Sequence, residues 1–325
     1  MIELDNNKLD VRFPEVHEDA RCSDGFQRTL RVPDDNQDYP LPAGLGRFPV
    51  LPVDDFEVPA GWKEHGGVFF PMYQAEAMWI SFQAGQYPFA VKIAAGKINA
   101  VSGGTWSNTL TGNPQDYVVI PQQPWLDGFS VAKDVIRQFV AAPLGQGLTA
   151  EEQLTGDAQW GGLQFIFYPM KAEEYRRLVQ ERARIMSSRR DFMSQAQSAS
   201  MGLAAGGRIR QEIAEDRYGL DVWDTSVSSR CFVHILNSQM YQLLTGQVPP
   251  TKAVTATQYA EARIPWFDFY LEGKTLDGSS TLAGLDSMAT ALLKQGKKLE
   301  DNKPIQIAKT IDLSKRSSLV RDGSF

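Results

Sequence analysis

FAVKIAAGKINAV, residues 89–101, is rich in apolar and β-branched residues and is interrupted by one glycine. Short runs of this composition are typical of buried strands. Similar runs follow at residues 117–120, 135–140 and 163–167, with turn dipeptides such as Gly-Gly, Asn-Pro and Asp-Gly between them. The spacing predicts a largely antiparallel or mixed β-sheet over residues 20–170, and with the helices predicted around it an α+β fold.

The segment before this region predicts a helix over residues 71–82. Pro71 suits the first position of a helix. The apolar residues that follow recur at helical spacing on one face, and they are Met72, Ala75, Trp79 and Phe82. We expect this helix to pack against the sheet and to be covered on most of its sides.

The C-terminal half predicts more helix than the N-terminal half. Residues 171–200 are charged, contain no glycine or proline, and favour one long helix or two short ones. The small-residue run 201–207 is expected to end that helix, and residues 208–213 to return to the sheet. The apolar run 231–236 predicts a further strand.

Capping residues predict two shorter helices in the same half. Asn237 or Ser238 begins one that stops at Gly246, and Thr255 begins the other. The patterns then divide the chain into a β-rich core region at 1–170, a helical or mixed region packed on the same body at 171–272, and a loosely ordered tail at 273–325.

Composition predicts a soluble, cytoplasmic globular protein. Of its 325 residues, 42% are hydrophobic and 22% are charged, and the net charge of −6 disfavours a nucleic-acid partner. The N-terminus lacks the features of a signal peptide, and no apolar run approaches the roughly 20 residues of a membrane helix. Two distant cysteines, Cys22 and Cys231, are expected to be free thiols in a reducing compartment.

No motif for a metal or a cofactor is found, so none is predicted. Three histidines with no second cysteine pair and no metal-binding spacing are insufficient for a metal site. His234, between Val233 and Ile235, is expected to be a core histidine with a hydrogen-bond partner. The small-residue run 201–207, followed by arginines, favours close packing over an anion-binding nest.

Glu76 is the first candidate for chemistry. A carboxylate on a covered helix must be paired or protonated, and Lys92 and Lys97 on the following strand are the expected partners. A bulge at Gly96 would bring both lysines to one face. The pair is either an acid/base pair in an aromatic pocket or, as the simpler interpretation, an ion pair that ties the helix to the sheet.

The segment QPWLDG, residues 123–128, holds the second group of candidates. Asp-Gly between apolar runs predicts a hairpin turn at Asp127. Gln123 and Trp125 are expected at a pocket mouth, where an amide beside an aromatic plate suits a sugar or another small polar ligand.

Several segments together resemble an uncharacterised family of soluble proteins from bacteria and fungi. They are QRTLR (27–31), YPLPAGLG (39–46), PMYQAEAMW (71–79), AVKIAAGKINAV (90–101), QPWLDG (123–128), RQFV (137–140), GLAAGG (202–207) and PWFD (265–268). The resemblance covers residues 10–272. Members of that family are often labelled hypothetical or "integral membrane protein" and have no known activity, so the resemblance implies no catalytic residue.

Three functional hypotheses follow. The first is a protein, possibly an enzyme, that binds a small polar ligand in an aromatic-lined pocket formed by Tyr73, Glu76, Trp79, Lys92, Lys97, Gln123 and Trp125. The second is a structural or protein–protein interaction protein, possibly a homo-oligomer, in which those residues form a closed core. The third is a peripheral membrane protein that docks through residues 171–200 and the basic tail.

Overall fold

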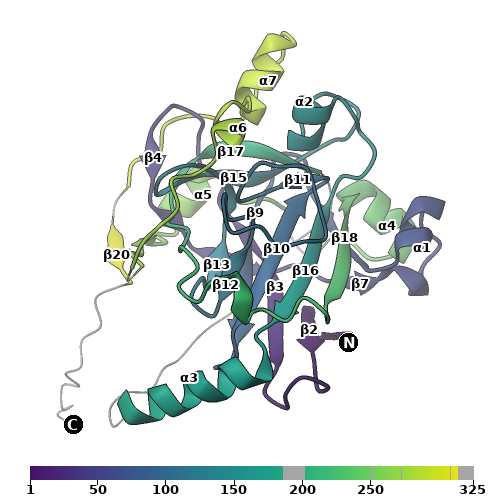
Figure 1. The fold of residues 1–325 in the computed structure, drawn as a ribbon. Coiled ribbons are helices and arrows are strands. Elements are labelled where there is room, and N and C mark those ends of the chain that lie inside the picture. Colours follow the sequence, from purple (N-terminus) through teal and green to yellow (C-terminus); the bar gives the residue numbers. More distant parts are fainter. Residues whose placement is uncertain (186–201, 250–251, 272, 308, 314–325) are drawn as a thin grey trace, which may run out of the picture.

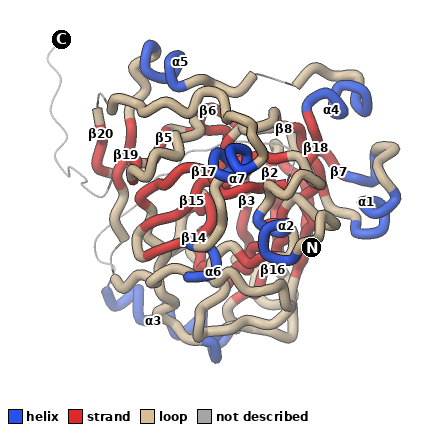
Figure 2. Tube along the Cα trace, turned by 90° about the horizontal axis from the view of Figure 1, so that it is seen from above, coloured by secondary structure: helices blue, strands red, loops and turns tan. Residues whose placement is uncertain are grey.

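The computed structural model describes residues 1–185, 202–249, 252–271, 273–307 and 309–313 (Figure 1). Two β-sheets form the body, and short helices lie around them (Figures 1 and 2). The described helices account for only 18% of the chain, and the three sheets are mostly antiparallel. The predicted α+β class is therefore confirmed.

The first sheet has ten strands and is built around β3 and β9. Its main path, in spatial order, is β1 (Ile2–Asp5), β2 (Lys8–Arg12), β3 (Arg21–Thr29), β9 (Ala77–Ala84), β15 (Val135–Ala142), β17 (Gly202–Arg210) and β4 (Asp38–Tyr39). Three shorter strands join this path at its sides: β6 (Gly44–Arg47), β13 (Trp125–Leu126) and β14 (Gly128–Ala132). Every pairing is antiparallel except that of β17 with β4.

The second sheet has seven strands, and a third, small sheet lies beside the first. The path of the second sheet is β11 (Ile98–Asn99), β10 (Phe89–Ala95), β16 (Leu163–Pro169), β18 (Ser229–Asn237), β8 (Val68–Met72) and β7 (Leu51–Pro52), with β12 (Val118–Ile120) paired to β10. The third sheet consists of β20 (Thr310–Asp312), β19 (Trp266–Asp268) and β5 (Leu41–Pro42). The strands predicted at 89–101, 135–140, 163–167 and 231–236 are all present.

The core lies between the two large sheets. Phe26 of β3 meets Phe70 of β8 and Phe165 of β16, with ring centroids 4.9 and 5.9 Å apart. Aromatic pairs at these separations stabilise a core beyond the area that they bury. Because alternate residues of a strand point to opposite faces, β3 directs Phe26 into this core and Gln27 to the other side of its sheet.

The helices are short and peripheral. They are α1 (Ala60–His65), α2 (Ala150–Thr155), α3 (Ala172–Ile185), α4 (Ser238–Thr245), α5 (Ala256–Glu261), α6 (Ser280–Ala283) and α7 (Met288–Lys294), with one-turn 3₁₀ segments at Val53–Asp55 and Leu220–Val222. Figures 1 and 2 both show α1 and α4 side by side at one edge of the body. The predicted caps at Asn237, Gly246 and Thr255 are confirmed.

The predicted helix at residues 71–82 is wrong, because this segment forms the end of β8, a turn, and most of β9. Ala75 at the turn has a left-handed backbone with φ of +64°, which interrupts any helix. Residues of β9 are apolar on both faces because the strand is central, between β3 and β15. An all-round apolar pattern does not distinguish a covered helix from such a strand.

The described part of the small-residue run, residues 202–207, is strand and forms most of β17. A side chain at Gly207 would collide with the backbone of Pro33, and one at Gly206 would contact Val140. Close packing, the interpretation favoured above, is therefore what the run provides. The predicted helix is present as α3, and its remainder at 186–200 lies outside the described residues.

The expectation of a more helical C-terminal half is not supported, because that half also supplies β16, β17 and β18 to the two large sheets. Part of the predicted loose tail is packed, since Leu282 of α6 and Met288 of α7 are buried. The division into three regions stays a prediction. In the described residues, no helix combines the length and the apolar character needed to cross a membrane.

Candidate functional site

Glu76 lies in the tight turn between β8 and β9, where Arg28 is its partner. One carboxylate oxygen accepts hydrogen bonds from Nε and Nη2 of Arg28, at 2.9 and 2.7 Å. The other accepts from the backbone N–H of Tyr73 at 3.1 Å. The predicted pairing of Glu76 with Lys92 or Lys97 is wrong, because Arg28 on the neighbouring strand occupies the carboxylate.

The Arg28–Glu76 pair is almost completely buried. Burial raises the pKa of the Glu76 carboxyl above its ordinary value, although the charge and hydrogen bonds of Arg28 act in the opposite direction. The guanidinium also lies 5.2 Å from the ring centroid of Phe48. These contacts leave Glu76 well satisfied, so its first role is to hold the turn and the strand together.

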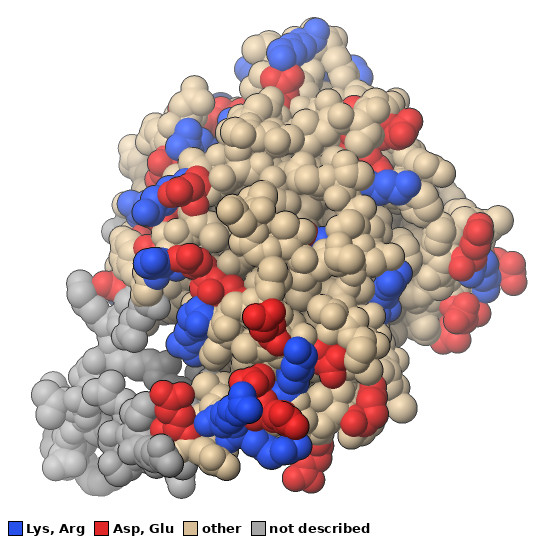
Figure 3. Space-filling view, in the orientation of Figure 1, with Lys and Arg blue, Asp and Glu red and all other residues tan. Residues whose placement is uncertain are grey.

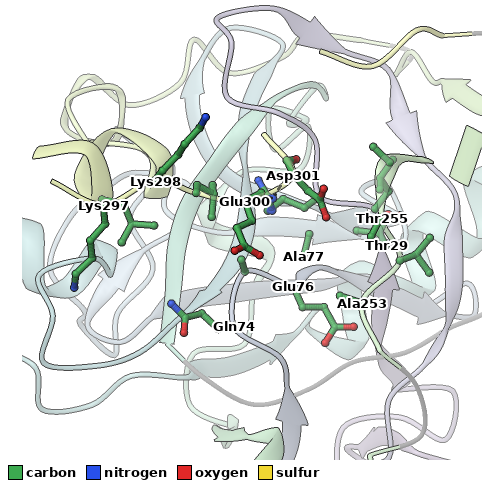
Figure 4. Close-up of a pocket in the computed structure, with 17 residues that line it drawn as sticks. Thr29, Gln74, Glu76, Ala77, Ala253, Thr255, Lys297, Lys298, Glu300 and Asp301 are labelled. Atoms are coloured by element: carbon green, nitrogen blue, oxygen red, sulfur yellow. Dashed lines mark hydrogen bonds between the residues drawn. The ribbon is translucent and has the colours of Figure 1, made fainter. Parts of the chain in front are cut away.

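A pocket of about 470 Å³ opens beside Glu76, and we call it the Glu76 pocket (Figure 4). Its walls come from segments that are distant in the sequence, residues 253–256 and 297–301. Arginines near the end of β3 hold both walls. Arg28 donates to the carbonyl of Lys252 at 2.8 Å, and Arg31 donates to the carbonyl of Glu300 at 2.6 Å. None of the described residues that line this pocket is aromatic.

The two lysines proposed as partners lie elsewhere. The buried ammonium of Lys92 donates to Asp116 at 2.6 Å, to Ser107 at 2.9 Å and to the carbonyl of Thr109 at 2.5 Å. That set of partners satisfies all three of its N–H groups. Lys97 follows β10, and its ammonium lies 4.3 Å from the ring centroid of Trp160, which is a cation–π contact.

The predicted aromatic residues Trp79 and Trp125 form a third group, apart from Glu76. Their ring centroids are 6.2 Å apart, and Trp125 also packs on Phe269 at 4.8 Å. Among the described residues, the Trp79 indole N–H and the side-chain amide of Gln27 are buried without a hydrogen-bond partner. Tyr73 contributes to the Glu76 turn through its backbone N–H.

The side chains of Gln123 and Asp127 are buried and form hydrogen bonds with other parts of the protein. The Gln123 amide donates to the carbonyls of Trp125 and Glu212 and accepts from the N–H of Ala214, at 3.0 to 3.2 Å. The predicted hairpin turn at Asp127 is wrong, because β13 pairs with β9 and β14 pairs with β15, and Asp127 is buried between them. Its carboxyl accepts a 2.7 Å hydrogen bond from Gln211, and burial raises its pKa to about 8.

A second pocket, of about 320 Å³, is the aromatic-lined one. Trp62 and His65 come from α1, Trp160 from the loop after α2, and Phe232 and His234 from β18. We call these five side chains and the space between them the aromatic pocket. Phe232 and His234 are two residues apart on a strand, so both face the same side. Trp62 and His65 are three apart on a helix and share a face.

The rings of the aromatic pocket contact one another. Trp62 stacks on His234 with centroids 4.5 Å apart and planes 15° apart. His65 lies 4.7 Å from Trp160 and 5.0 Å from Phe232. The stack fixes His234 and Trp62, while His65 joins the rings of the loop to those of the strand.

His234 has a satisfied ring, as predicted for a core histidine. Its Nε2 lies 2.9 Å from the carbonyl oxygen of Gly66. Because a carbonyl oxygen only accepts, Nε2 carries the proton and donates. Burial lowers the pKa of His234 to about 4, so the imidazole is neutral at pH 7.

Glu151 lies next to the loop that carries Trp160. One carboxylate oxygen accepts from the backbone N–H groups of Trp160 and Gly161, at 3.3 and 3.0 Å. Within the described part of the chain, the indole N–H of Trp160 is buried without a partner. Burial raises the pKa of the Glu151 carboxyl, and the hydrogen bonds from Gly161 and Trp160 and the charge of Lys97 oppose that rise.

Most of the aromatic pocket has no signal in the sequence. Its one residue discussed there is His234, as a core histidine, and no pattern singles out Trp62, His65 or Trp160 as pocket residues. The one available signal was the pair Trp62 and His65, whose spacing of three places both rings on one face of a short helix. Nothing in the sequence connects that helix to Trp160 or to β18, because only the fold brings them together.

The described residues contain no group of three or more His, Cys, Asp or Glu side chains that is arranged to hold a metal ion. Comparison with protein-family models, curated proteins and solved structures gives no match to this chain. The resemblance noted in the sequence therefore stays an expectation, and the argument for function depends on the geometry of the pockets.

Proposed function

We propose that the chain binds a small polar ligand with a flat face in the aromatic pocket. The observation that carries the proposal is the convergence of five ring side chains from three separate segments on one pocket of about 320 Å³. Ligand pockets of roughly 300–1,000 Å³ are typically lined by aromatic side chains with a few polar groups among them. A sugar or a planar heterocycle offers the matching flat surface.

The polar groups at this pocket are mostly uncharged donors and acceptors. His234 is neutral at pH 7, and its ring N–H is already used by Gly66. The indole N–H of Trp160 is buried, so a ligand in the pocket contacts the ring of this residue and not its N–H.

The test is a binding screen with two matched tryptophan variants. Monosaccharides and planar heterocycles, such as adenine and nicotinamide, are titrated into the protein while tryptophan fluorescence and the thermal midpoint are followed. Trp160→Phe keeps a ring but reduces its flat surface, so we expect ligand affinity to fall by up to about tenfold, the equivalent of about 1.4 kcal/mol of lost ring contact. Trp106→Phe is the control, because a lysine ammonium also lies over the Trp106 ring, 5.7 Å from its centroid.

The proposal is contradicted if no member of the panel raises the midpoint of the wild type, or if both tryptophan variants lower affinity equally. An enzymatic role is part of the same hypothesis, and Glu151 is the carboxylate that contacts the Trp160 loop.

The alternative is a protein–protein interaction role. At α4 and just beyond it, Met240, Leu243 and Val248 are 51%, 78% and 69% exposed. Exposed apolar side chains grouped in this way are typical of an interface. A second copy of the chain is the partner to test first, by measuring the mass in solution of the wild type and of Leu243→Lys. A monomer at all concentrations would exclude self-association through α4.

A further inference from the structure

The Glu76 pocket has the chemistry of a second, different binding site. It shares no lining residue with the aromatic pocket. Charged side chains of both signs line it: Arg31, Lys297 and Lys298 are cationic, and Glu76, Glu300 and Asp301 are acidic. A pocket with equal numbers of both signs favours neither a simple anion nor a simple cation.

The two signs are separated along the pocket. Figure 4 shows Lys297 and Lys298 at one end and Thr29 and Thr255 at the other, with Glu300 and Glu76 between them. Both lysines and Glu300 are exposed, whereas Glu76 is buried at the floor. Arg31 is already engaged with backbone carbonyls of the wall. The lysines, Glu300 and Asp301 are therefore the charged groups to which a ligand has access.

The backbone around the pocket is strained at two positions. Ala75 and Asp301, with φ of +64° and +50°, both line it. A left-handed backbone is unfavourable for an alanine, because its Cβ crowds the following carbonyl oxygen. Strain of this kind tends to persist where it positions functional groups. Here it places Gln74 and Glu76 on either side of Ala75 at the pocket, and Glu300 beside Asp301.

We propose that the Glu76 pocket binds a small zwitterion, a molecule that carries an anionic group and an amine. The anionic group lies against Lys298, and the ammonium is held by Glu300, with Asp301 beside it (Figure 4). Opposite charges on one ligand each find a partner here, and a ligand with only one charge leaves half of the site unpaired.

The test is calorimetric titration of the full chain with matched probes. The zwitterions are β-alanine, γ-aminobutyrate and ε-aminocaproate, which sample increasing separations of the two charges. Each is compared with the alkylamine and the alkanoate of the same length. We expect one zwitterion to bind at least tenfold more tightly than both of its singly charged analogues.

Two exposed variants assign the ends of the ligand. Lys298→Met is expected to lower the affinity of the zwitterion to that of the alkylamine, and Glu300→Gln to that of the alkanoate. Lys294→Met and Glu261→Gln are the controls, because both residues are exposed and lie outside the pocket lining. All four positions are on the surface, so we expect the four variants to fold like the wild type. Thermal unfolding of each variant tests this expectation.

Three outcomes overturn the proposal: no zwitterion binds, the single-charge analogues bind as tightly, or the controls weaken binding as much as the pocket variants. Trp160→Phe separates this proposal from the one for the aromatic pocket. That variant is expected to leave zwitterion binding unchanged. The proposal for one pocket is therefore tested independently of the proposal for the other.

Discussion

Arg28 and Glu76 are 48 residues apart in the chain, yet two guanidinium nitrogens of Arg28 contact one carboxylate oxygen of Glu76 at 2.9 and 2.7 Å. Their side chains are only 6% and 2% exposed. Arg28 is on β3 and Glu76 immediately precedes β9, the neighbouring strand. The pair therefore joins the centre of the first sheet to the turn that forms the floor of the Glu76 pocket.

Glu76→Gln is expected to lower the free energy of unfolding by about 3–5 kcal/mol, because it leaves the buried Arg28 guanidinium without a counter-charge. Urea unfolding measures this loss. The matched control is Glu174→Gln, which breaks a 2.6 Å pair with an Arg177 side chain that is 70% exposed. Exposed pairs contribute about 0–1 kcal/mol, so the control should change little. Equal effects of the two substitutions would show that the Glu76 charge is not needed for stability.

Asp127 should make stability depend on pH between about 4 and 8. In the unfolded chain its carboxyl loses the proton near its ordinary pKa of about 3.9, whereas burial keeps the proton on in the folded protein up to a pKa of about 8. The stability associated with this group is complete below pH 4, falls as the pH rises, and is lost above pH 8.

Asp127→Asn removes this titration. Relative to the wild type, we expect the variant to gain stability from pH 5 to pH 8, at up to about 1.4 kcal/mol per pH unit. Denaturant unfolding at several pH values gives the slope. Asp157→Asn, at an exposed loop position, should run parallel to the wild type. A flat difference between Asp127→Asn and the wild type would exclude a raised pKa at this position.

Much of the sheet was predictable because buried strands leave local signals. The runs at 89–101, 135–140 and 231–236 are short, apolar and β-branched, and the caps at Asn237 and Thr255 act within one helical turn. The segment 71–82 was not predictable in this way. Its apolar residues fit a helical face and a central strand equally well, and the pairing of β9 with β3 and β15 decides between them.

The candidate sites were harder to predict, because both depend on contacts between distant segments. Glu76 was identified as a buried carboxylate that needs a partner, which is correct in physical terms. The partner was sought on the following strand, whereas Arg28 comes from the preceding part of the chain. The aromatic pocket forms only where α1, the Trp160 loop and β18 come into contact in the fold. No local sequence pattern predicts that contact.

His234 is expected to stay neutral well into the acid range. Burial lowers its pKa to about 4, whereas an unfolded histidine titrates near 6.5. The stability that this group contributes is complete above pH 6.5 and is lost as the pH falls towards 4, because the unfolded chain takes up the proton first. NMR titration of the ring protons, assigned with His234→Gln, measures the pKa directly. A midpoint near 6.5 would contradict the burial of the ring.

Gly67 should be far less tolerant of substitution than its neighbour Gly66. Both have positive φ, +87° at Gly67 and +63° at Gly66, so alanine strains the backbone at either position. At Gly66 an added Cβ meets open space, but at Gly67 it would collide with the carbonyl oxygen of Phe232 on β18.

We therefore expect Gly66→Ala to cost about 1–2 kcal/mol of unfolding free energy, the backbone strain alone, and Gly67→Ala to cost a further 1–3 kcal/mol for the clash. Because Phe232 also lines the aromatic pocket, Gly67→Ala should weaken ligand binding there while Gly66→Ala leaves it nearer to the wild type. Urea unfolding and the fluorescence titration measure both effects. Equal losses for the two variants would mean that β18 yields to the added methyl group, and that the pocket tolerates movement of this strand.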